Sequence, residues 1–369
     1  MKTYKNLYPK ICDFSNLLLA ARQAQKGKRF QDIVARFNIN LESELILLKK
    51  ELNSKSYTPG AYHSFYIYEP RTRMISAAPY RDRVVHHSLC NIITPILEKS
   101  MIYDSYANRK GKGTHDAVKR YQYYAQKYPY GLKCDIKKFF PSIDHEILKL
   151  ILRKKIACKD TLWLIDGIID NSNPQENTLQ YYEGDSLLTP IERKKGLPIG
   201  NLTSQWFGNF YLNEMDHFIK ERLKCKAYVR YVDDFILLAD SKEILAEWRH
   251  LITDYLKKVR MILHPQKTII FRSIDGVPFL GHRIFPHYRK LNSDNVKRFR
   301  KRLKKTVIRL KKEKISTTDF DQSLMGWVAH ASFSKTYFLQ EQIFSDLESE
   351  GIDSEKARCL ARRLLEQQS

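Results

Sequence analysis

The sequence lacks the features of membrane, secreted and disulfide-rich proteins. It has no run of about 18 apolar residues, which a transmembrane helix needs. Its first residues, MKTYKNLYPKICDF, are too polar for a secretory signal. Its six cysteines are scattered without any C-x-x-C pair, so neither a zinc site nor a disulfide framework is indicated. We therefore expect a protein of a reducing cytoplasm that has no membrane partner.

Acidic residues are also scarce relative to basic ones. The 41 Asp and Glu face 64 Lys and Arg, which gives a formal net charge of +23. Such an excess indicates a polyanionic partner, and nucleic acid is the partner we expect. The 369 residues are 43% hydrophobic, enough for one large or two ordinary globular domains with a buried core.

The chemistry centres on the segment Tyr228–Asp240, YVRYVDDFILLAD. Its pattern predicts a hairpin with strands Tyr228–Val232 and Phe235–Ala239 and with Asp233 and Asp234 at the turn. A turn can direct both carboxylates into one space, where their hard oxygen atoms suit Mg²⁺. A hydrophilic surface turn is the alternative, but flanks this apolar are not those of an ordinary surface hairpin.

A third carboxylate comes from Asp135 in the segment GLKCDIKKFFPSIDH, residues 131–145. Asp135 follows a short strand-like run and precedes a turn into a helix that begins near His145. Three carboxylates of this kind can hold a pair of metal ions for nucleotidyl transfer.

Several further segments accompany these two in a fixed order. They are RMISAAPYRDRVVHHSL, SYANRKGKGTHDAV, GLPIGNLTSQWFGNFYLNEMD, LHPQKT and FLGHRI. Together with the aspartate segments they resemble the ordered blocks of reverse transcriptases. The resemblance implies an α+β right-hand polymerase, with fingers and palm in which an antiparallel sheet packs on helices, and with a helical thumb. We expect an N-terminal helical extension at residues 1–60, fingers and palm at 61–288 and a basic helical thumb at 289–369.

The resemblance also implies the metal ligands. Asp135 and Asp233 would bridge two Mg²⁺ ions, for which Mn²⁺ is a substitute, and Asp234 would complete the site. The backbone carbonyl of Ile136 is a further expected ligand. The residues expected to contact the nucleotide or its base pair are Arg73, Lys138, Phe139, Phe140, Ile199, Gly200, Gln205 and Lys267.

Five of these residues have specific expected roles. Arg73 would contact the triphosphate and base, because a guanidinium bonds phosphate oxygens bidentately and can also stack. The amides of Lys138 and Phe139 would also lie at the triphosphate. Phe140 would stack under the ribose and exclude a 2′-hydroxyl, and Lys267 is a candidate general acid for the leaving pyrophosphate. A solvated basic loop around Arg73 and core packing of Phe139 and Phe140 are the alternatives.

The segment Arg289–Lys314 holds 13 Lys and Arg against two acidic residues. Apolar residues recur in it at helical spacing, which predicts an amphipathic helix with one basic face. By resemblance this helix is a thumb that lies along duplex phosphates, and the segment containing Leu280 and Gly281 is the primer grip; a solvated charged face is the alternative. The candidate nucleic-acid contacts are Leu280, Gly281, Lys297, Arg298, Lys301, Lys304 and Lys305. We expect neither a ribonuclease H domain nor an endonuclease domain after them.

Residues 199–205, IGNLTSQ, depart from the commonest pattern of the family, in which Gln-Gly stands where this chain has Ile199-Gly200. This IGNLTSQ segment resembles that of the reverse transcriptases of diversity-generating retroelements. Those enzymes copy a template-repeat RNA into cDNA with frequent errors at adenines. This implies an RNA-directed DNA polymerase encoded by a bacterium, an archaeon or a phage. Its expected partners are template RNA, the RNA/cDNA duplex, dNTPs and a small basic accessory variability protein.

Several other functions stay open at this point. Within the family they are a group II intron, a retron or an abortive-infection reverse transcriptase. Outside it, a basic RNA-binding protein with a degenerate palm would lack metal-dependent primer extension.

Three local patterns complete the expectations. Residues 1–55 show helical spacing of apolar residues, and the aromatic stripe from Ser204 to about Leu223 predicts one long helix. Asp275-Gly276 predicts a hairpin that joins strands at residues 268–271 and 277–285.

Overall fold

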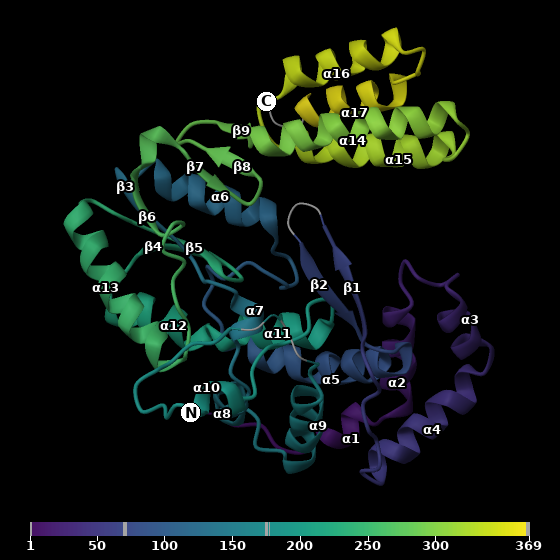
Figure 1. The fold of residues 1–369 in the computed structure, drawn as a ribbon, viewed down its shortest axis with the longest axis vertical. Coiled ribbons are helices and arrows are strands. Elements are labelled where there is room, and N and C mark those ends of the chain that lie inside the picture. The colour runs from purple at the N-terminus through teal and green to yellow at the C-terminus, as the bar shows by residue number, and fades with distance from the viewer. Residues whose placement is uncertain (1, 69–71, 174–175, 177, 367–369) are drawn as a thin grey trace. The chain divides into compact units, whose positions relative to one another are not determined.

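The computed structural model describes residues 2–68, 72–173, 176 and 178–366. Helices and antiparallel strands are mixed along the chain, which confirms the expected α+β class (Figure 1). The chain divides into two compact units. Residues 1–113, 133–236 and 246–269 form the first unit, and residues 114–132, 237–245 and 270–369 form the second. The boundaries expected after residues 60 and 288 remain predictions.

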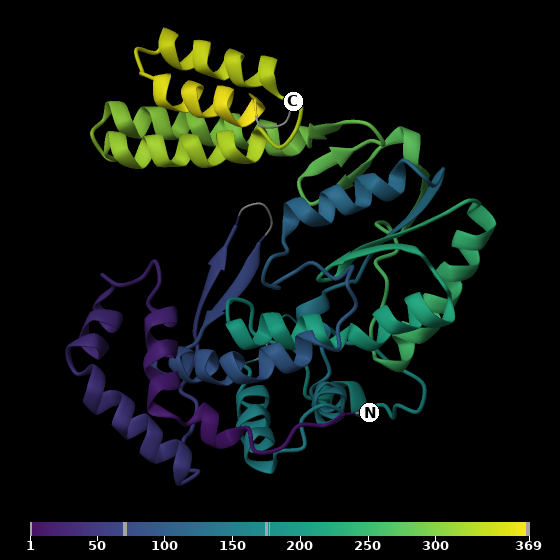
Figure 2. The ribbon, with the colours of Figure 1, turned by 180° about the vertical axis from the view of Figure 1, so that it is seen from behind.

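The N-terminal part of the first unit is helical, as the apolar spacing predicts. Asp13 caps the second helix by accepting a hydrogen bond from the Ser15 amide at 3.0 Å. The helices are α1 (Tyr8–Ile11), α2 (Phe14–Ala24), α3 (Asp32–Ile39) and α4 (Leu41–Asn53). α2 packs along α5 (Tyr80–Glu98), as Figure 2 shows from behind.

A two-stranded ribbon follows, formed by β1 (His63–Ile67) and β2 (Arg73–Ala77). The strands pair antiparallel, with Phe65 opposite Ile75. The segment around Ile199 pairs with the free edge of β2, where the Ser76 amide donates to the Ile199 carbonyl at 3.0 Å. The ribbon is therefore joined directly to the segment that contains the IGNLTSQ motif.

The central sheet has the strand order β4-β5-β3-β6. Its strands are β3 (Tyr130–Asp135), β4 (Ala227–Tyr231), β5 (Asp234–Ala239) and β6 (Ile269–Arg272), and α13 (Lys242–Lys258) follows β5 in the chain. β5 is buried almost throughout, which explains its run of five apolar residues after Asp234.

The remaining helices of the first unit precede β4. They are α7 (Phe139–Ser142), α8 (His145–Arg153), α9 (Lys159–Asp170), α10 (Thr189–Glu192), α11 (Leu202–Tyr211) and α12 (Asn213–His217). A π-helical turn, Phe218–Arg222, follows α12. The prediction of one continuous helix from Ser204 to about Leu223 is therefore wrong. Leu212 interrupts it with ψ near 3°, although the aromatic stripe is buried as expected.

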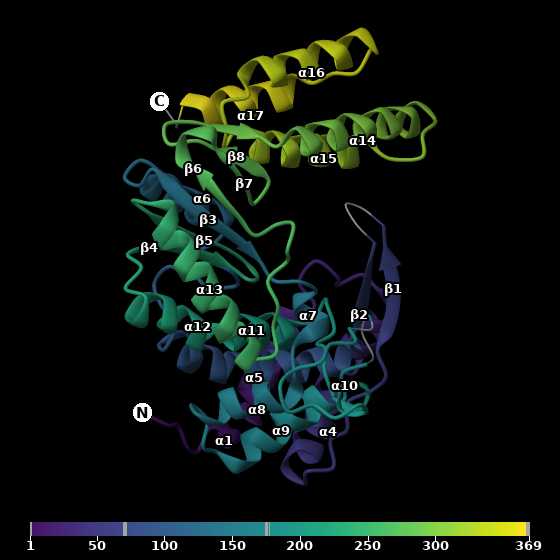
Figure 3. The same cartoon turned by 60° about the vertical axis from the view of Figure 1, so that its left-hand side comes forward.

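The second unit contains a three-stranded antiparallel sheet and a bundle of helices (Figure 3). The strands are β7 (Val277–Phe279), β8 (His282–Ile284) and β9 (Arg289–Leu291), and α6 (Thr114–Ala125) also belongs to this unit. The bundle consists of α14 (Ser293–Lys311), α15 (Thr317–Ala331), α16 (Tyr337–Ser349) and α17 (Glu355–Glu366). Phe299 stacks on Trp327 at 4.0 Å between ring centroids in the core of the bundle.

The predicted hairpin through Asp275-Gly276 is wrong. Gly276 has the expected left-handed φ of 69°, but β6 pairs in the central sheet whereas β7 pairs with β8. The Ser273 amide donates to the Pro129 carbonyl at 2.8 Å, which holds the end of β6 beside the start of β3. Leu280 and Gly281, with φ of 49° and 89°, then fold residues 277–284 back on themselves.

Candidate active site

The three candidate carboxylates lie on neighbouring strands. Asp135 ends β3, Asp234 begins β5, and Asp233 lies in the turn between β4 and β5. The Ile136 amide donates to the Asp233 carbonyl at 3.3 Å, which fixes the end of β3 against this turn. The turn itself is Val232-Asp233, with Val232 at φ 57°, so Asp234 already belongs to a strand. The structure thus brings together the carboxylates that the sequence placed 98 residues apart, at positions 135 and 233.

Two of these carboxylates are poorly solvated. Burial raises the pKa of Asp233 to about 6, and the charge of Asp135 adds to the rise while Lys267 and Arg73 oppose it. Burial raises the pKa of Asp234 to about 7, where Lys133 opposes the rise and the other two aspartates add to it. In the described part of the chain, Asp234 Oδ1 is buried and accepts no hydrogen bond. Burial and mutual repulsion therefore disfavour the ionised forms of Asp233 and Asp234 more than the nearby cations favour them.

Lys267 is the cation nearest to the third carboxylate. Its Nζ atom lies 2.8 and 3.0 Å from the two Asp135 oxygens. This contact exists because residues 262–264 run beside the end of β3, where the Lys137 amide donates to the Ile262 carbonyl at 2.9 Å and the His264 amide donates to the Asp135 carbonyl at 2.7 Å. The structure therefore places Lys267 at the carboxylate site, and its role as a general acid for the leaving pyrophosphate remains a prediction.

The donor set fits a hard divalent cation. Carboxylate oxygens are the ligands that Mg²⁺ prefers, and the partnerless Asp234 oxygen and the raised pKa values of Asp233 and Asp234 both indicate a missing positive charge. Among the described residues, no three His, Cys, Asp or Glu side chains converge as a finished metal site. Lys267 holds both oxygens of Asp135, so metal binding there requires the ammonium to move away. The ligand role of the Ile136 carbonyl remains a prediction.

The residues after Asp135 form a tight turn into α7. Lys138 adopts the left-handed conformation, with φ 48°, and its side chain pairs with Glu176 at 2.6 Å. Phe139 is buried, whereas Phe140 is partly exposed. A Cβ atom on Gly208 of α11 would lie 3.1 Å from Phe140 and 3.2 Å from Phe139, so this glycine lets both rings pack on the helix. Because Phe140 is partly exposed, it is a better candidate for contact with the ribose than the buried Phe139.

Arg73 begins β2 and is exposed, and its charge acts on Asp233. Near it, Ile199 is partly exposed and Gly200 has a φ of 117°, which only glycine adopts readily. A Cβ atom on Gly200 would lie 3.0 Å from the Ile75 side chain. Gln205 is exposed on the first turns of α11.

Sequence reasoning missed the role of Asn201. Its buried side chain accepts from the Ala78 amide at 3.1 Å and donates to the Ser76 carbonyl at 2.9 Å. These two bonds continue the pairing between β2 and the segment that carries Ile199 and Gly200. The signal in the sequence was an asparagine that follows the apolar residues Leu197–Gly200.

A buried charged network behind the catalytic turn was also missed. The guanidinium of Arg230 lies 2.7 and 2.5 Å from the two oxygens of Asp216, and both side chains are fully buried. Arg230 also donates to Asn209 Oδ1 at 2.8 Å and to the Val232 carbonyl at 3.0 Å, and the Tyr228 hydroxyl donates to Asp216 at 2.7 Å. The network therefore holds the residue next to Asp233. The sequence feature that pointed to this network was the arginine in the middle of the apolar and aromatic run YVRYVDD.

The predicted nucleic-acid residues belong to the second unit. Leu280 and Gly281 form the β7–β8 turn, and Asn295 Nδ2 donates to the Gly281 carbonyl at 3.0 Å. The five predicted contacts on α14 are exposed, while Arg300 is only partly exposed and Phe299 and Val307 of the same helix are buried. These exposed residues are Lys297, Arg298, Lys301, Lys304 and Lys305. The predicted basic face therefore exists, and its ligand remains a prediction.

Adjacent strands that present clustered, buried aspartates are the arrangement that two-metal nucleotidyl transfer uses. Residues 68–284, more than half of the chain, match the family described as "Reverse transcriptase (RNA-dependent DNA polymerase)". The chain belongs to this family. The expected reverse transcriptase family is thereby confirmed.

Two curated fungal proteins are similar to this chain. The "Putative COX1/OXI3 intron 2 protein" of Saccharomyces cerevisiae is 24% identical over 333 residues, which cover 74% of this chain and 38% of that protein. The "Uncharacterized 91 kDa protein in cob intron" of Schizosaccharomyces pombe is 24% identical over 274 residues, covering 58% of this chain and 32% of that protein. The chain thus spans well under half of either relative.

Among solved structures, two telomerases resemble the fold weakly. That of Candida tropicalis has a TM-score of 0.44 at 16% identity and covers 64% of this chain and 49% of its own. That of Candida albicans has a TM-score of 0.43 at 14% identity and covers 67% of this chain and 50% of its own.

In the described residues, no helix is long and apolar enough to cross a membrane.

Proposed function

We propose that this chain extends a DNA strand along an RNA template, with Asp135, Asp233 and Asp234 holding two Mg²⁺ ions. The cluster of three aspartates at adjacent strand ends, two of them with pKa values raised by burial and one with a buried oxygen that accepts no hydrogen bond among the described residues, is the observation that carries the proposal. When bound, the ions would lower the pKa of the primer 3′-hydroxyl and stabilise charge on the leaving pyrophosphate.

The protein residues would orient the nucleotide and supply a proton. Arg73 offers a bidentate guanidinium to the phosphates from the exposed start of β2. The tight turn at Lys138 directs successive backbone amides, which suit phosphate oxygens. Lys267, already at the carboxylate site, is placed to donate a proton to the leaving pyrophosphate.

Primer extension with the variant Asp233→Asn tests this proposal. Loss of one metal-binding carboxylate should abolish synthesis on an RNA template while binding of the primer-template persists. Asp240→Asn, an exposed aspartate at the end of β5, is the matched control and should polymerise normally. Near-normal synthesis by Asp233→Asn would remove the two-metal assignment.

The biological system of the enzyme is a separate question. The similar curated proteins are intron proteins, which supports the group II intron alternative better than a diversity-generating retroelement. The IGNLTSQ segment supports the retroelement, because it resembles the corresponding segment of retroelement reverse transcriptases. Its Ile199 side chain is partly exposed, while the Ile199 carbonyl accepts a hydrogen bond from β2. We therefore retain, as the finer proposal, a polymerase that copies a template repeat with errors at adenines. Its small basic accessory protein and its bacterial, archaeal or phage origin belong to that finer proposal.

Sequencing cDNA copied from a defined RNA separates the two systems. Frequent errors opposite template adenine would support the retroelement, and faithful copying of adenine would support the intron type. Isoleucine offers no polar atom where a glutamine could hydrogen-bond to the nucleic-acid backbone. Ile199→Gln should therefore lower the error rate roughly fivefold to tenfold, if a single hydrogen bond of about 1 kcal/mol is gained. Equal error rates in variant and parent would remove Ile199 from the explanation.

A further inference from the structure

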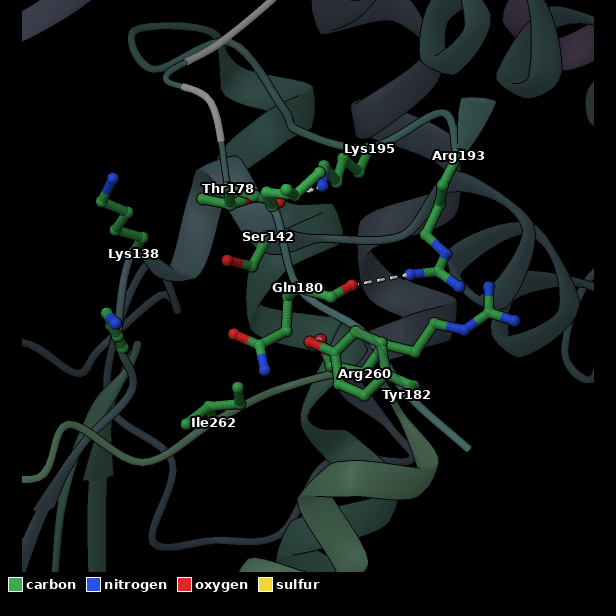
Figure 4. Close-up of a pocket in the computed structure, with 11 residues that line it drawn as sticks. Lys138, Ser142, Thr178, Gln180, Tyr182, Arg193, Lys195, Arg260 and Ile262 are labelled. Carbon is green, nitrogen blue, oxygen red and sulfur yellow. Dashed lines mark hydrogen bonds between the residues drawn. The ribbon is translucent and has the colours of Figure 1, made fainter. Parts of the chain in front are cut away.

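A basic pocket lies in the first unit, beside the strand that carries Asp135 (Figure 4). Its cavity has a volume of about 140 Å³. One wall is the turn Lys137–Ser142, a second is the segment Thr178–Tyr182, and a third is formed by Arg260 and Ile262. Arg193 and Lys195 close it from the segment that precedes the IGNLTSQ motif.

The charges around this pocket do not balance. The lining has five cationic side chains and no acidic one: Lys137, Lys138, Arg193, Lys195 and Arg260. Among the described residues, three carboxylates pair with these cations. Asp144 pairs with Arg260 at 2.5 Å and with Arg193 at 3.5 Å. Asp185 pairs with Arg193, and Glu176 pairs with Lys138. The described residues therefore leave about two positive charges at the pocket uncompensated.

The two lysines without a carboxylate partner are the informative ones. Lys195 Nζ contacts the backbone carbonyls of Thr178 and Pro190 and forms no direct ion pair with a described carboxylate, although the charges of Asp144 and Asp185 act on it from further away. Burial and the nearby charge of Arg193 lower the pKa of Lys195. The ammonium of Lys137 is exposed and makes no ion pair with any described acidic residue.

Neutral hydrogen-bonding groups supplement these charges. The side chains of Ser142 and Gln180 lie between Lys138 on one side and the two arginines on the other (Figure 4). Hydroxyl and amide donors beside ammonium and guanidinium groups are the usual composition of a phosphate site. A cavity of this size suits a small anion better than a strand of nucleic acid, which needs an open groove.

We propose that this pocket binds a diphosphate group, with Lys137 and Lys195 as its principal charged contacts. The proposed polymerase function supplies two sources of that chemistry, the released pyrophosphate and the triphosphate tail of a dNTP, and the inference rests on that function only for the source. Lys137 is two residues from Asp135, so a diphosphate here would lie next to the strand that carries Asp135, and none of the three aspartates lines the pocket.

Equilibrium dialysis of the full chain against radiolabelled pyrophosphate tests the site. The buffer contains EDTA, so that binding does not depend on metal at the aspartates. We expect the double variant Lys137→Gln/Lys195→Gln to bind at least about tenfold more weakly than the parent, since two charge-assisted contacts to phosphate are lost. Lys159→Gln, an exposed lysine on α9 outside the pocket lining, should bind like the parent.

The variant Asp233→Asn separates this inference from the proposed function. It should keep pyrophosphate binding even though it should not polymerise. The single variant Lys137→Gln controls for misfolding of the double variant, because Lys137 is exposed and the melting temperature should not change. It should weaken pyrophosphate binding severalfold. Binding by the double variant equal to that of the parent would overturn the site.

Competition by unlabelled ligands identifies the source. Displacement by pyrophosphate and dTTP at similar concentrations, but not by dTMP, would indicate the triphosphate tail, and displacement by pyrophosphate alone would indicate the product. If a single-stranded RNA oligonucleotide displaces the label at lower concentration than pyrophosphate, the pocket binds RNA phosphates and the diphosphate assignment is wrong.

Discussion

Removing the charge of Asp234 should stabilise the metal-free protein at neutral and alkaline pH. The fold raises the pKa of this carboxyl from 3.8 to about 7, chiefly through burial. A group whose pKa is raised by folding contributes stability below its unfolded pKa and loses that contribution as the pH rises through the folded value. The ionised Asp234 therefore destabilises the parent increasingly between about pH 4 and pH 8.

The magnitude follows from the two pKa values. The difference between 3.8 and about 7 corresponds to about 4 kcal/mol, at about 1.4 kcal/mol for each tenfold change in proton affinity. This is an upper bound, because Asp234→Asn also removes the ion pair with Lys133 at 3.5 Å. We therefore expect the variant to gain about 1 to 3 kcal/mol at pH 8, which is a rise of about 2 to 6 °C in melting temperature.

Thermal melting in EDTA across pH 4 to 8 measures this effect. The gain should be largest at pH 8 and disappear near pH 4, where both proteins carry an uncharged side chain. Mg²⁺ should raise the melting temperature of the parent at pH 8 and that of Asp234→Asn much less, since the metal supplies the missing positive charge. Asp240→Asn should follow the parent throughout. An equal or lower melting temperature of metal-free Asp234→Asn at pH 8, with an unchanged response to Mg²⁺, would refute the reasoning.

Three further substitutions test the support of the site. Arg230→Met should cost about 3 to 5 kcal/mol of stability, measured by denaturant unfolding, because Asp216 would keep a buried charge without its partner; stability within about 1 kcal/mol of the parent would contradict this. Phe140→Ala should admit ribonucleotides in primer extension, and an unchanged preference for dNTPs would assign sugar discrimination to another residue. Gly200→Ala should destabilise the fold by about 1 to 3 kcal/mol, because its φ of 117° and the 3.0 Å approach to Ile75 both exclude a Cβ atom; unaltered unfolding would show that the segment relaxes freely.

Local patterns in the sequence were sufficient for most elements and for the kind of chemistry. The near four-residue spacing of apolar residues predicted the N-terminal helices, and the YVDD segment predicted the hairpin of β4 and β5. The choice of Asp135, Asp233 and Asp234 followed from carboxylates placed in apolar surroundings, which is a property of residue types and short spacings. The confirmed α+β class and reverse transcriptase family rest on the same segments.

The tertiary structure decided what long-range packing controls. Lys267 meets Asp135 across 132 residues because residues 262–264 run beside β3, and no periodicity in either segment encodes that pairing. The strands on either side of Gly276 enter different sheets, because a hydrogen bond from Ser273 to the Pro129 carbonyl holds the end of β6 while the left-handed turn at Leu280 folds the next strands together. A buried arginine such as Arg230 can be recognised only once its partners are known, since burial of a charge is tolerated only where distant side chains compensate it.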